Sequence, residues 1–228
     1  MKPNPTASPF ADMIVTPPLK NILKSAYQCS AISTTCSCVR YAPQNGLLPR
    51  GYTGAFGHVS DVKLVICLAE PGEPDPDEFY DVKLTPEKLI DDIAKRVAQA
   101  YSENCSPFHR NVRRVLDYCW PQLSFDDQLK FTWITEATLC SAQKTTGPVP
   151  RRVENECAVR YLKPQLALFS HAFVIALGKK AERRLELIDR KPDVVARAAG
   201  RPTGDFETAD ASWKNAGIQF RDFIKTDS

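Results

Sequence analysis

Residues 62–72 read VKLVICLAEPG, an apolar run that stops at an acid, a proline and a glycine. A short apolar run such as Val62 to Leu68 has the length of a buried parallel strand, and Glu70-Pro71-Gly72 breaks it with a tight turn. This stretch therefore predicts a core strand that carries an acid just after its carboxyl end.

The segments that follow repeat the order of strand and helix. Thr85-Pro86-Glu87 has the composition of a helix start, with a capping threonine, a proline in the first turn and an early acid. Further apolar runs predict strands at Phe131 to Thr135, Ala172 to Leu177 and Val194 to Ala199. Helices are predicted at 19–27, 107–119, 153–169, 179–187 and 211–223, besides the one that starts near Thr85. The alternation predicts an α/β fold, a three-layer α/β/α arrangement with a central, mostly parallel, four-stranded sheet.

Composition describes a globular protein of one main domain. The chain has 228 residues, of which 43% are hydrophobic and 25% charged, and its formal net charge of +3 permits nucleic-acid binding without demanding it. Five prolines in residues 1–18 predict an N-terminal arm outside the core, which leaves 19–228 as the domain. No membrane-length apolar run and no signal-peptide pattern are present, so we expect a cytoplasmic protein with no membrane contact. In that compartment the eight cysteines are read as thiols or metal ligands rather than as disulfides.

Two acids follow predicted strands, where the active sites of parallel sheets gather. Glu70 can orient a water or stabilise a cation, although taken alone this motif favours a surface turn with a solvated acid. Glu136 emerges from an apolar run, where a carboxylate is usually paired or functional. The Pro/Gly-containing loop after it carries Lys144, Arg151 and Arg152, which suit either a DNA phosphate backbone or a solvated surface.

The cysteines give a weaker signal by spacing alone. Cys140 and Cys157 flank the basic loop, while Cys29, Cys36 and Cys38 lie near the N-terminus. Four thiolates of this kind suit an iron–sulfur cluster or zinc, and buried unpaired thiols are the alternative. His58, His109 and His171 have no metal-ligand spacing with one another.

Taken in order, these segments resemble the uracil-DNA glycosylase superfamily, iron–sulfur type, from about Cys36 to Phe223. The resemblance lies in Gly54-Ala55-Phe56-Gly57 with Val62 to Gly72, in Ile134-Thr135-Glu136-Ala137-Thr138-Leu139-Cys140, and in Cys157-Ala158-Val159-Arg160-Tyr161-Leu162 through Val174-Ile175-Ala176-Leu177-Gly178-Lys179-Lys180-Ala181. It implies a structural 4Fe-4S cluster on Cys140, Cys157 and two of Cys29, Cys36 and Cys38, with zinc or no metal as the alternatives.

The resemblance also implies roles for pocket residues. Glu70 falls where many members place the acid or amide that handles the attacking water. Glu136 replaces the asparagine of uracil-specific members, and an ionised carboxylate accepts a hydrogen bond from an exocyclic amine, as in pairing with cytosine N4. Arg201-Pro202-Thr203 is the best match to the histidine motif that stabilises the departing base, and Phe79 or Tyr80 is expected to stack on it.

The function expected from this resemblance is a monofunctional DNA glycosylase. It would flip out and hydrolytically excise an altered base, with a modified cytosine as the first expectation, for example in phage DNA as an antiviral defence. A repair enzyme for uracil or another deaminated base is one alternative, and a catalytically inactive DNA-binding member is a second. A cysteine-rich zinc protein unrelated to DNA is the third. The expected partner is double-stranded or single-stranded DNA, bound by a monomer.

Overall fold

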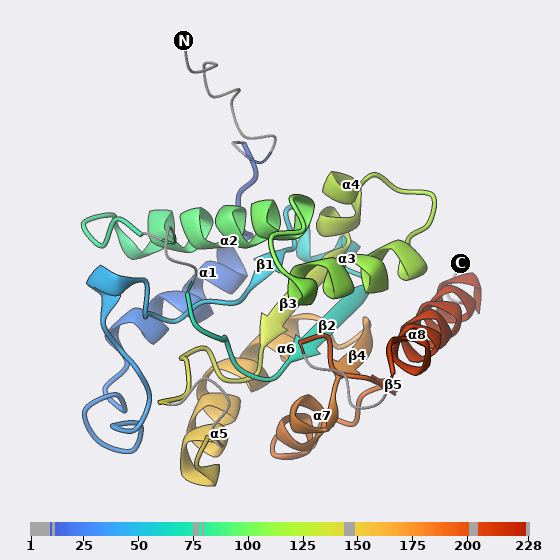
Figure 1. The fold of residues 1–228 in the computed structure, drawn as a ribbon. Coiled ribbons are helices and arrows are strands. Elements are labelled where there is room, and N and C mark those ends of the chain that lie inside the picture. Colours follow the sequence, from blue (N-terminus) through green and yellow to red (C-terminus); the bar gives the residue numbers. More distant parts are fainter. Residues whose placement is uncertain are drawn as a thin grey trace.

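A single sheet forms the centre of the computed structural model, which describes residues 10, 12–74, 78, 80–143, 149–200 and 205–226. Its strands run in the order β1-β3-β2-β4-β5 (Figure 1). The strands are β1 (Thr53–Gly54), β2 (Leu64–Leu68), β3 (Thr132–Glu136), β4 (Phe173–Leu177) and β5 (Val194–Ala196). The predicted α/β class is confirmed.

The sheet has one strand more than the predicted four. β2, β3, β4 and β5 are mutually parallel, but β1 adds an antiparallel edge beside β3, so the sheet is mixed. Two residues are too few to leave a hydrophobic pattern in the sequence, which is why β1 was not predicted. Gly54 makes this edge possible, because its φ is +96° and a Cβ there would lie 2.1 Å from the backbone oxygen of Thr132.

Helices cover both faces of the sheet because its strand residues point alternately to either side. On β2, Val65 and Cys67 face one hydrophobic cluster, whereas Leu64 and Ile66 face the other. The first cluster takes residues from α1 (Pro17–Leu23), α2 (Pro86–Ser102), α5 (Arg151–Cys157), α6 (Lys163–Leu168) and α7 (Lys179–Glu186). The second takes residues from the carboxyl-terminal part of α2 and from α3 (Pro107–Cys119), α4 (Phe125–Lys130) and α8 (Phe206–Thr226). Figure 1 shows α3 and α4 on one side of the sheet and α5, α6 and α7 on the other.

The helices begin where the sequence places capping residues. Thr85 accepts a hydrogen bond from the Lys88 amide at the start of α2, and Ser106 accepts one from the His109 amide at the start of α3. α5 continues through a π-helical turn (Ala158–Leu162) into α6, so the predicted helix over 153–169 is present in three joined pieces. Within the described part of the chain, no helix has both the length and the apolarity that crossing a membrane requires.

The segment before α1 packs on the domain. Phe10 and Val15 are buried, and the Phe10 ring meets the Phe125 ring edge to face at 6.0 Å. The Val15 amide also donates to Asp91 Oδ1 at 2.9 Å. The expected N-terminal arm outside the core is thus corrected for residues 10 and 12–18. Phe10 and Val15 pack against the domain despite the local proline content, whereas Ile14, Pro17 and Pro18 are exposed.

Candidate active site

The carboxyl ends of the parallel strands open into a cleft of about 650 Å³. Ladder pairing places Leu68 opposite Glu136, and the pairing continues one step further because the Ala137 amide donates to the Leu68 carbonyl at 3.0 Å. The turn that holds Glu70 therefore lies beside the end of β3. The cleft is lined by Arg50, Gly51, Leu68, Ala69, Glu70, Pro71, Gly72, Glu73, Glu78, Val97, Tyr101, Ser106, Phe108, His109, Glu136, Leu177, Ala198, Ala199 and Gly200. The two predicted acids thus share one cleft.

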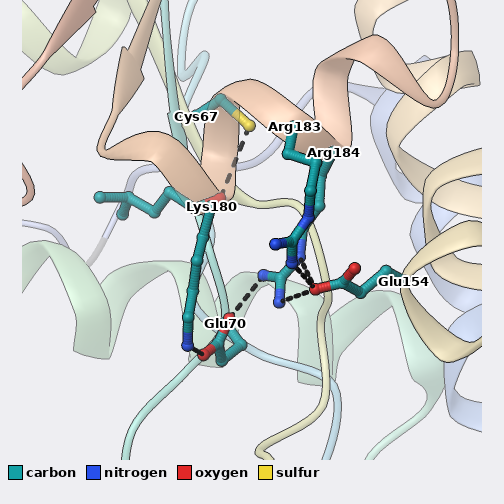
Figure 2. Close-up of polar contacts among 7 residues, drawn as sticks. Cys67, Glu70, Glu154, Lys180, Arg183 and Arg184 are labelled. Carbon is teal, nitrogen blue, oxygen red and sulfur yellow. Dashed lines mark hydrogen bonds and ion pairs between the residues drawn. The ribbon is translucent and has the colours of Figure 1, made fainter. Parts of the chain in front are cut away.

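Glu70 is held by two cations from α7 (Figure 2). Lys180 Nζ binds its Oε1 at 2.8 Å, and Arg184 Nη1 lies 2.6 Å from its Oε2. Burial raises the pKa of this carboxyl, but Arg184 and Lys180 together outweigh burial and hold the pKa below its usual value. Glu70 is accordingly an ionised carboxylate at neutral pH.

Arg184 is a site residue that the sequence analysis missed. Its side chain is fully buried, and its Nε and Nη2 donate to Glu154 Oε1 at 3.2 and 3.0 Å. Arg183 adds a further hydrogen bond to the same oxygen at 2.5 Å (Figure 2). The available signal was its position on α7, three residues after buried Ala181 and next to buried Leu185. A charge on the apolar side of a helix indicates a partner inside the protein.

Glu136 is the last residue of β3 and is 4% exposed. Its Oε2 has no hydrogen-bond partner among the residues that the structure describes. Burial, followed by the negative charge of Glu70, raises the pKa of Glu136 well above its usual value, and this outweighs the nearby Arg184 and Arg50. We infer that Glu136 is a neutral acid in the free protein, with one O–H donor and one carbonyl acceptor.

Gly51 makes room for Glu136. A Cβ at position 51 would lie 2.4 Å from Glu136 Cγ, and its φ of +85° is one that side-chain-bearing residues seldom adopt. The backbone can therefore approach the carboxylic acid closely only because this residue is a glycine.

A second buried arginine, Arg50, fixes the turn after β2. Its Nη2 donates to the Gly72 carbonyl at 2.7 Å and its Nη1 to Ser141 Oγ at 2.9 Å. Ser141 Oγ also donates to the Gly72 carbonyl at 2.9 Å. The sequence analysis missed Arg50, because nothing in its local sequence separates it from a surface arginine.

Tyr80, one of the two predicted stacking residues, does not line the cleft. It is fully buried in the core and donates to Glu78. The other, Phe79, lies outside the described residues. Among the described aromatic residues, Tyr101, Phe108 and His109 line the cleft, and the Phe108 and His109 rings are 5.3 Å apart.

The two predicted basic residues that the structure describes do not line the cleft. Arg151 and Arg152 are exposed in the first turn of α5, and neither contributes to the described lining. Lys144 and Arg201 lie outside the described residues. The chain approaches position 201 along the cleft wall, however, because Ala198, Ala199 and Gly200 line it and Asn111 Nδ2 donates to the Ala199 carbonyl at 2.8 Å.

Four of the five predicted metal-binding cysteines surround a second, smaller cavity. Cys29, Cys36, Cys140 and Cys157 line it together with the side chains of Ala26, Ile32, Val39, Pro49, Leu139, Val153 and Tyr161. Cys38, two residues after Cys36 in the sequence, is not part of this lining. Burial, followed by the negative charge of the neighbouring thiolates, raises the pKa of Cys36 to about 12. Burial is also the largest cause of the shift at Cys157 and raises the pKa of this thiol to about 11.

The thiols do not converge on one point. Within the described ranges, no three histidine, cysteine or acidic side chains lie close enough together to hold a single metal ion. A tetrahedral zinc would require four sulfurs, each about 2.3 Å from the metal. The fold has nonetheless brought cysteines separated by more than a hundred residues in the chain around one cavity.

No protein-family model matches this chain, and no curated protein sequence matches it.

Proposed function

We propose that the protein is a DNA N-glycosylase that hydrolyses the bond between a flipped-out altered pyrimidine and its deoxyribose. The observation that carries this proposal is the pair of carboxyl groups in one cleft, one bound by two cations and the other buried, whose pKa values are shifted in opposite directions. Glu70 is ionised by Arg184 and Lys180, whereas Glu136 is kept neutral by burial. Carboxyl groups whose environments separate their pKa values are typical of acid–base and charge-stabilising sites.

Glu70 supplies negative charge to the sugar. When the bond from C1′ to the base nitrogen breaks, its electron pair leaves with the base and positive charge develops on the deoxyribose. The carboxylate stabilises that charge and orients a water whose oxygen forms the new bond to C1′, while the proton that this water loses passes through solvent to the departing base. Because its pKa is lowered, Glu70 acts mainly through charge and orientation and is a weak proton acceptor.

Glu136 reads the pyrimidine edge. As a neutral acid it can donate its proton to N3 of a cytosine and accept a hydrogen bond from N4. The reverse pattern pairs it with N3–H and O4 of uracil. The neutral acid therefore suits both base types, which makes uracil a second candidate substrate beside a modified cytosine.

The size of the cleft favours a substituted base. A volume of about 650 Å³ lies in the range of about 300–1,000 Å³ that is usual for pockets binding drug-sized molecules. A bare pyrimidine ring would leave much of this volume to water. We therefore keep a 5-substituted cytosine, as in modified phage DNA, as the first candidate and antiviral defence as the associated role.

Other residues complete the proposed site. Phe108 replaces Tyr80 as the stacking side chain because it lines the cleft, and stacking on an aromatic ring contributes about 1–3 kcal/mol per base. Lys144, Arg151 and Arg152 are retained as candidates for phosphate contacts, and Arg201 as the cation beside the departing base. The proposed partner is DNA, double- or single-stranded, bound by a cytoplasmic monomer.

We assign the cysteine cavity to a 4Fe-4S cluster held by Cys29, Cys36, Cys140 and Cys157. The donor set suits such a group, because four cysteine thiolates would be its ligands, although the cavity of about 10 Å³ would have to widen to admit it. The apolar lining suits a buried cluster. When bound, the cluster supplies cross-links among chain segments rather than chemistry at the base.

The test is release of bases from matched duplexes that carry uracil, cytosine, 5-hydroxymethylcytosine or glucosylated 5-hydroxymethylcytosine. Abasic sites are counted for the wild-type protein, Glu70→Gln and the matched control Asp222→Asn, an exposed carboxylate on α8. We expect release of the modified cytosines to fall by about 10²–10³-fold in Glu70→Gln and to be unchanged in Asp222→Asn. Release of uracil alone would favour the repair enzyme, and no release from any duplex would favour the DNA-binding protein.

A further inference from the structure

The cysteine cavity and the cleft share parts of the chain. Pro49 lines the cavity and Arg50 the cleft. Cys140 lines the cavity, and the next residue, Ser141, is bound to Arg50 and to the Gly72 carbonyl in the cleft wall. α5 brings Cys157 to the cavity and, one turn earlier, carries the partner of Arg184. Each of these three segments thus serves both places.

One connection runs through Arg184 and is visible in Figure 2. Glu154 is 2% exposed and accepts two hydrogen bonds from Arg184, whose Nη1 lies 2.6 Å from Glu70 Oε2. Arg184 is itself fully buried, so water cannot replace either partner at low cost. A movement of α5 therefore changes the position of Glu70.

A second connection runs through Arg50. Its amide donates to the Leu139 carbonyl at 2.9 Å, and its Nη2 donates to the Gly72 carbonyl at 2.7 Å. Leu139 belongs to the cavity wall and Gly72 to the turn of Glu70. The turn is consequently held from two sides by groups attached to the cavity.

We propose that Arg184 and Arg50 are positioning residues that couple the four-cysteine cavity to the location of Glu70. The cavity then acts as a structural support of the cleft, and opening it releases the turn at residues 70–72. The consequence for base release rests on the proposed function, whereas the mechanical coupling does not.

Coupling between two sites is reciprocal, so a change in the cleft must alter the cavity. The purified full-length protein is treated with iodoacetamide, and alkylation of each cysteine is followed by peptide mass spectrometry. In Glu70→Gln we expect Cys140 and Cys157 to react faster by about 5- to 150-fold, the usual range for coupled sites. Glu154→Gln should give the same result. In the double variant, the increase in alkylation rate should be smaller than the product of the two single increases, because both changes act through Arg184.

Two controls separate coupling from general loss of stability. Cys119 is buried on the opposite face of the sheet, so its alkylation rate reports global unfolding. Asp91→Asn removes the Lys20 ion pair, which is also largely buried but lies outside the cleft lining. Coupling predicts a faster rate for Cys140 and Cys157 relative to Cys119 in Glu70→Gln and not in Asp91→Asn. An unchanged ratio in Glu70→Gln would overturn the proposal.

A kinetic measurement tests the positioning role. Glu154 does not line the cleft, so Glu154→Gln should lower the single-turnover rate of base release at saturating protein while the half-saturating concentration stays the same. Arg184→Lys should also lower this rate, because one ammonium cannot bridge two carboxylates as a guanidinium does. A wild-type rate in Arg184→Lys would overturn the positioning role. If wild-type protein releases no base, the proposed function fails and the alkylation ratio still decides the coupling.

Discussion

Arg184 bridges Glu70 and Glu154: its Nη1 lies 2.6 Å from Glu70 Oε2, and its Nη2 donates to Glu154 Oε1 at 3.0 Å. The fully buried guanidinium of Arg184 is stable only beside these carboxylates, because without them its charge would lack both water and a counter-ion. The energetics of the cleft and of the fold are therefore linked at this residue.

Arg184→Met should lower the free energy of unfolding by up to about 3–5 kcal/mol, since it removes the buried cation of Glu154 and leaves that carboxylate only the half-exposed Arg183. Glu154→Gln combined with Arg184→Met should restore part of that loss, because one of the two carboxylates left behind is then neutral. Urea unfolding followed by circular dichroism measures both. A double variant that is less stable than Arg184→Met would contradict this explanation of the pair.

Stability should fall as the pH rises because Glu136 resists ionisation. Its pKa in the folded protein lies well above the value of about 4.3 that it has in the unfolded chain. The folded state thus keeps a proton that the unfolded state has released. The contribution of Glu136 to stability is complete below its pKa in the unfolded chain. Above that pKa it decreases by up to about 1.4 kcal/mol per pH unit until the pKa in the folded protein is passed.

Glu136→Gln cannot ionise and should lack this slope. Its stability relative to wild type should increase between pH 5.5 and pH 8, measured by urea unfolding. Glu70 has the opposite sign, because its lowered pKa stabilises the fold above the unfolded pKa and that contribution is lost only as the pH falls through the folded pKa. The chosen range avoids its titration, and parallel pH profiles of the two proteins would refute a raised pKa at Glu136.

Gly51→Ala should lower both the stability of the protein and its rate of base release. The added Cβ would lie 2.4 Å from Glu136 Cγ at a φ of +85°, so Glu136 must move. Overpacking of this kind costs about 1–3 kcal/mol. Gly57→Ala is the matched control, because its Cβ would meet nothing closer than 3.6 Å. Equal unfolding midpoints and equal rates of base release for the two variants would exclude the close approach.

Cysteine variants should separate cluster ligands from their neighbour. Cys29→Ser and Cys36→Ser should lose bound iron and sulfide together with the visible absorbance of the cluster, because serine is a poor ligand for iron in such a cluster. Cys38→Ser should retain all three, since Cys38 does not line the cavity. Iron retained in Cys29→Ser and lost in Cys38→Ser would reverse the assignment.

Much of the fold was predictable from local patterns. α3 has the predicted bounds, and the apolar runs before Glu70 and Gly178 are the parallel strands β2 and β4. The edge strand β1 and the short helix α4 were not predicted, because each is too short to show a period. Tyr80 was expected in the pocket from its place in the sequence, yet its apolar ring is buried in the core.

The sequence alone determined the α/β class, the approximate positions of the parallel strands and the two acids near the carboxyl ends of β2 and β3, since these depend on residues a few positions apart. Only the tertiary structure decided which distant side chains meet. It placed Arg184 between Glu70 and Glu154, selected Cys29 and Cys36 rather than Cys38 for the cavity, and left Glu136 Oε2 buried without a hydrogen-bond partner among the described residues. The pKa of an acid and the closure of a cavity depend on burial and on charges contributed by remote segments. Those quantities exist only once the chain has folded.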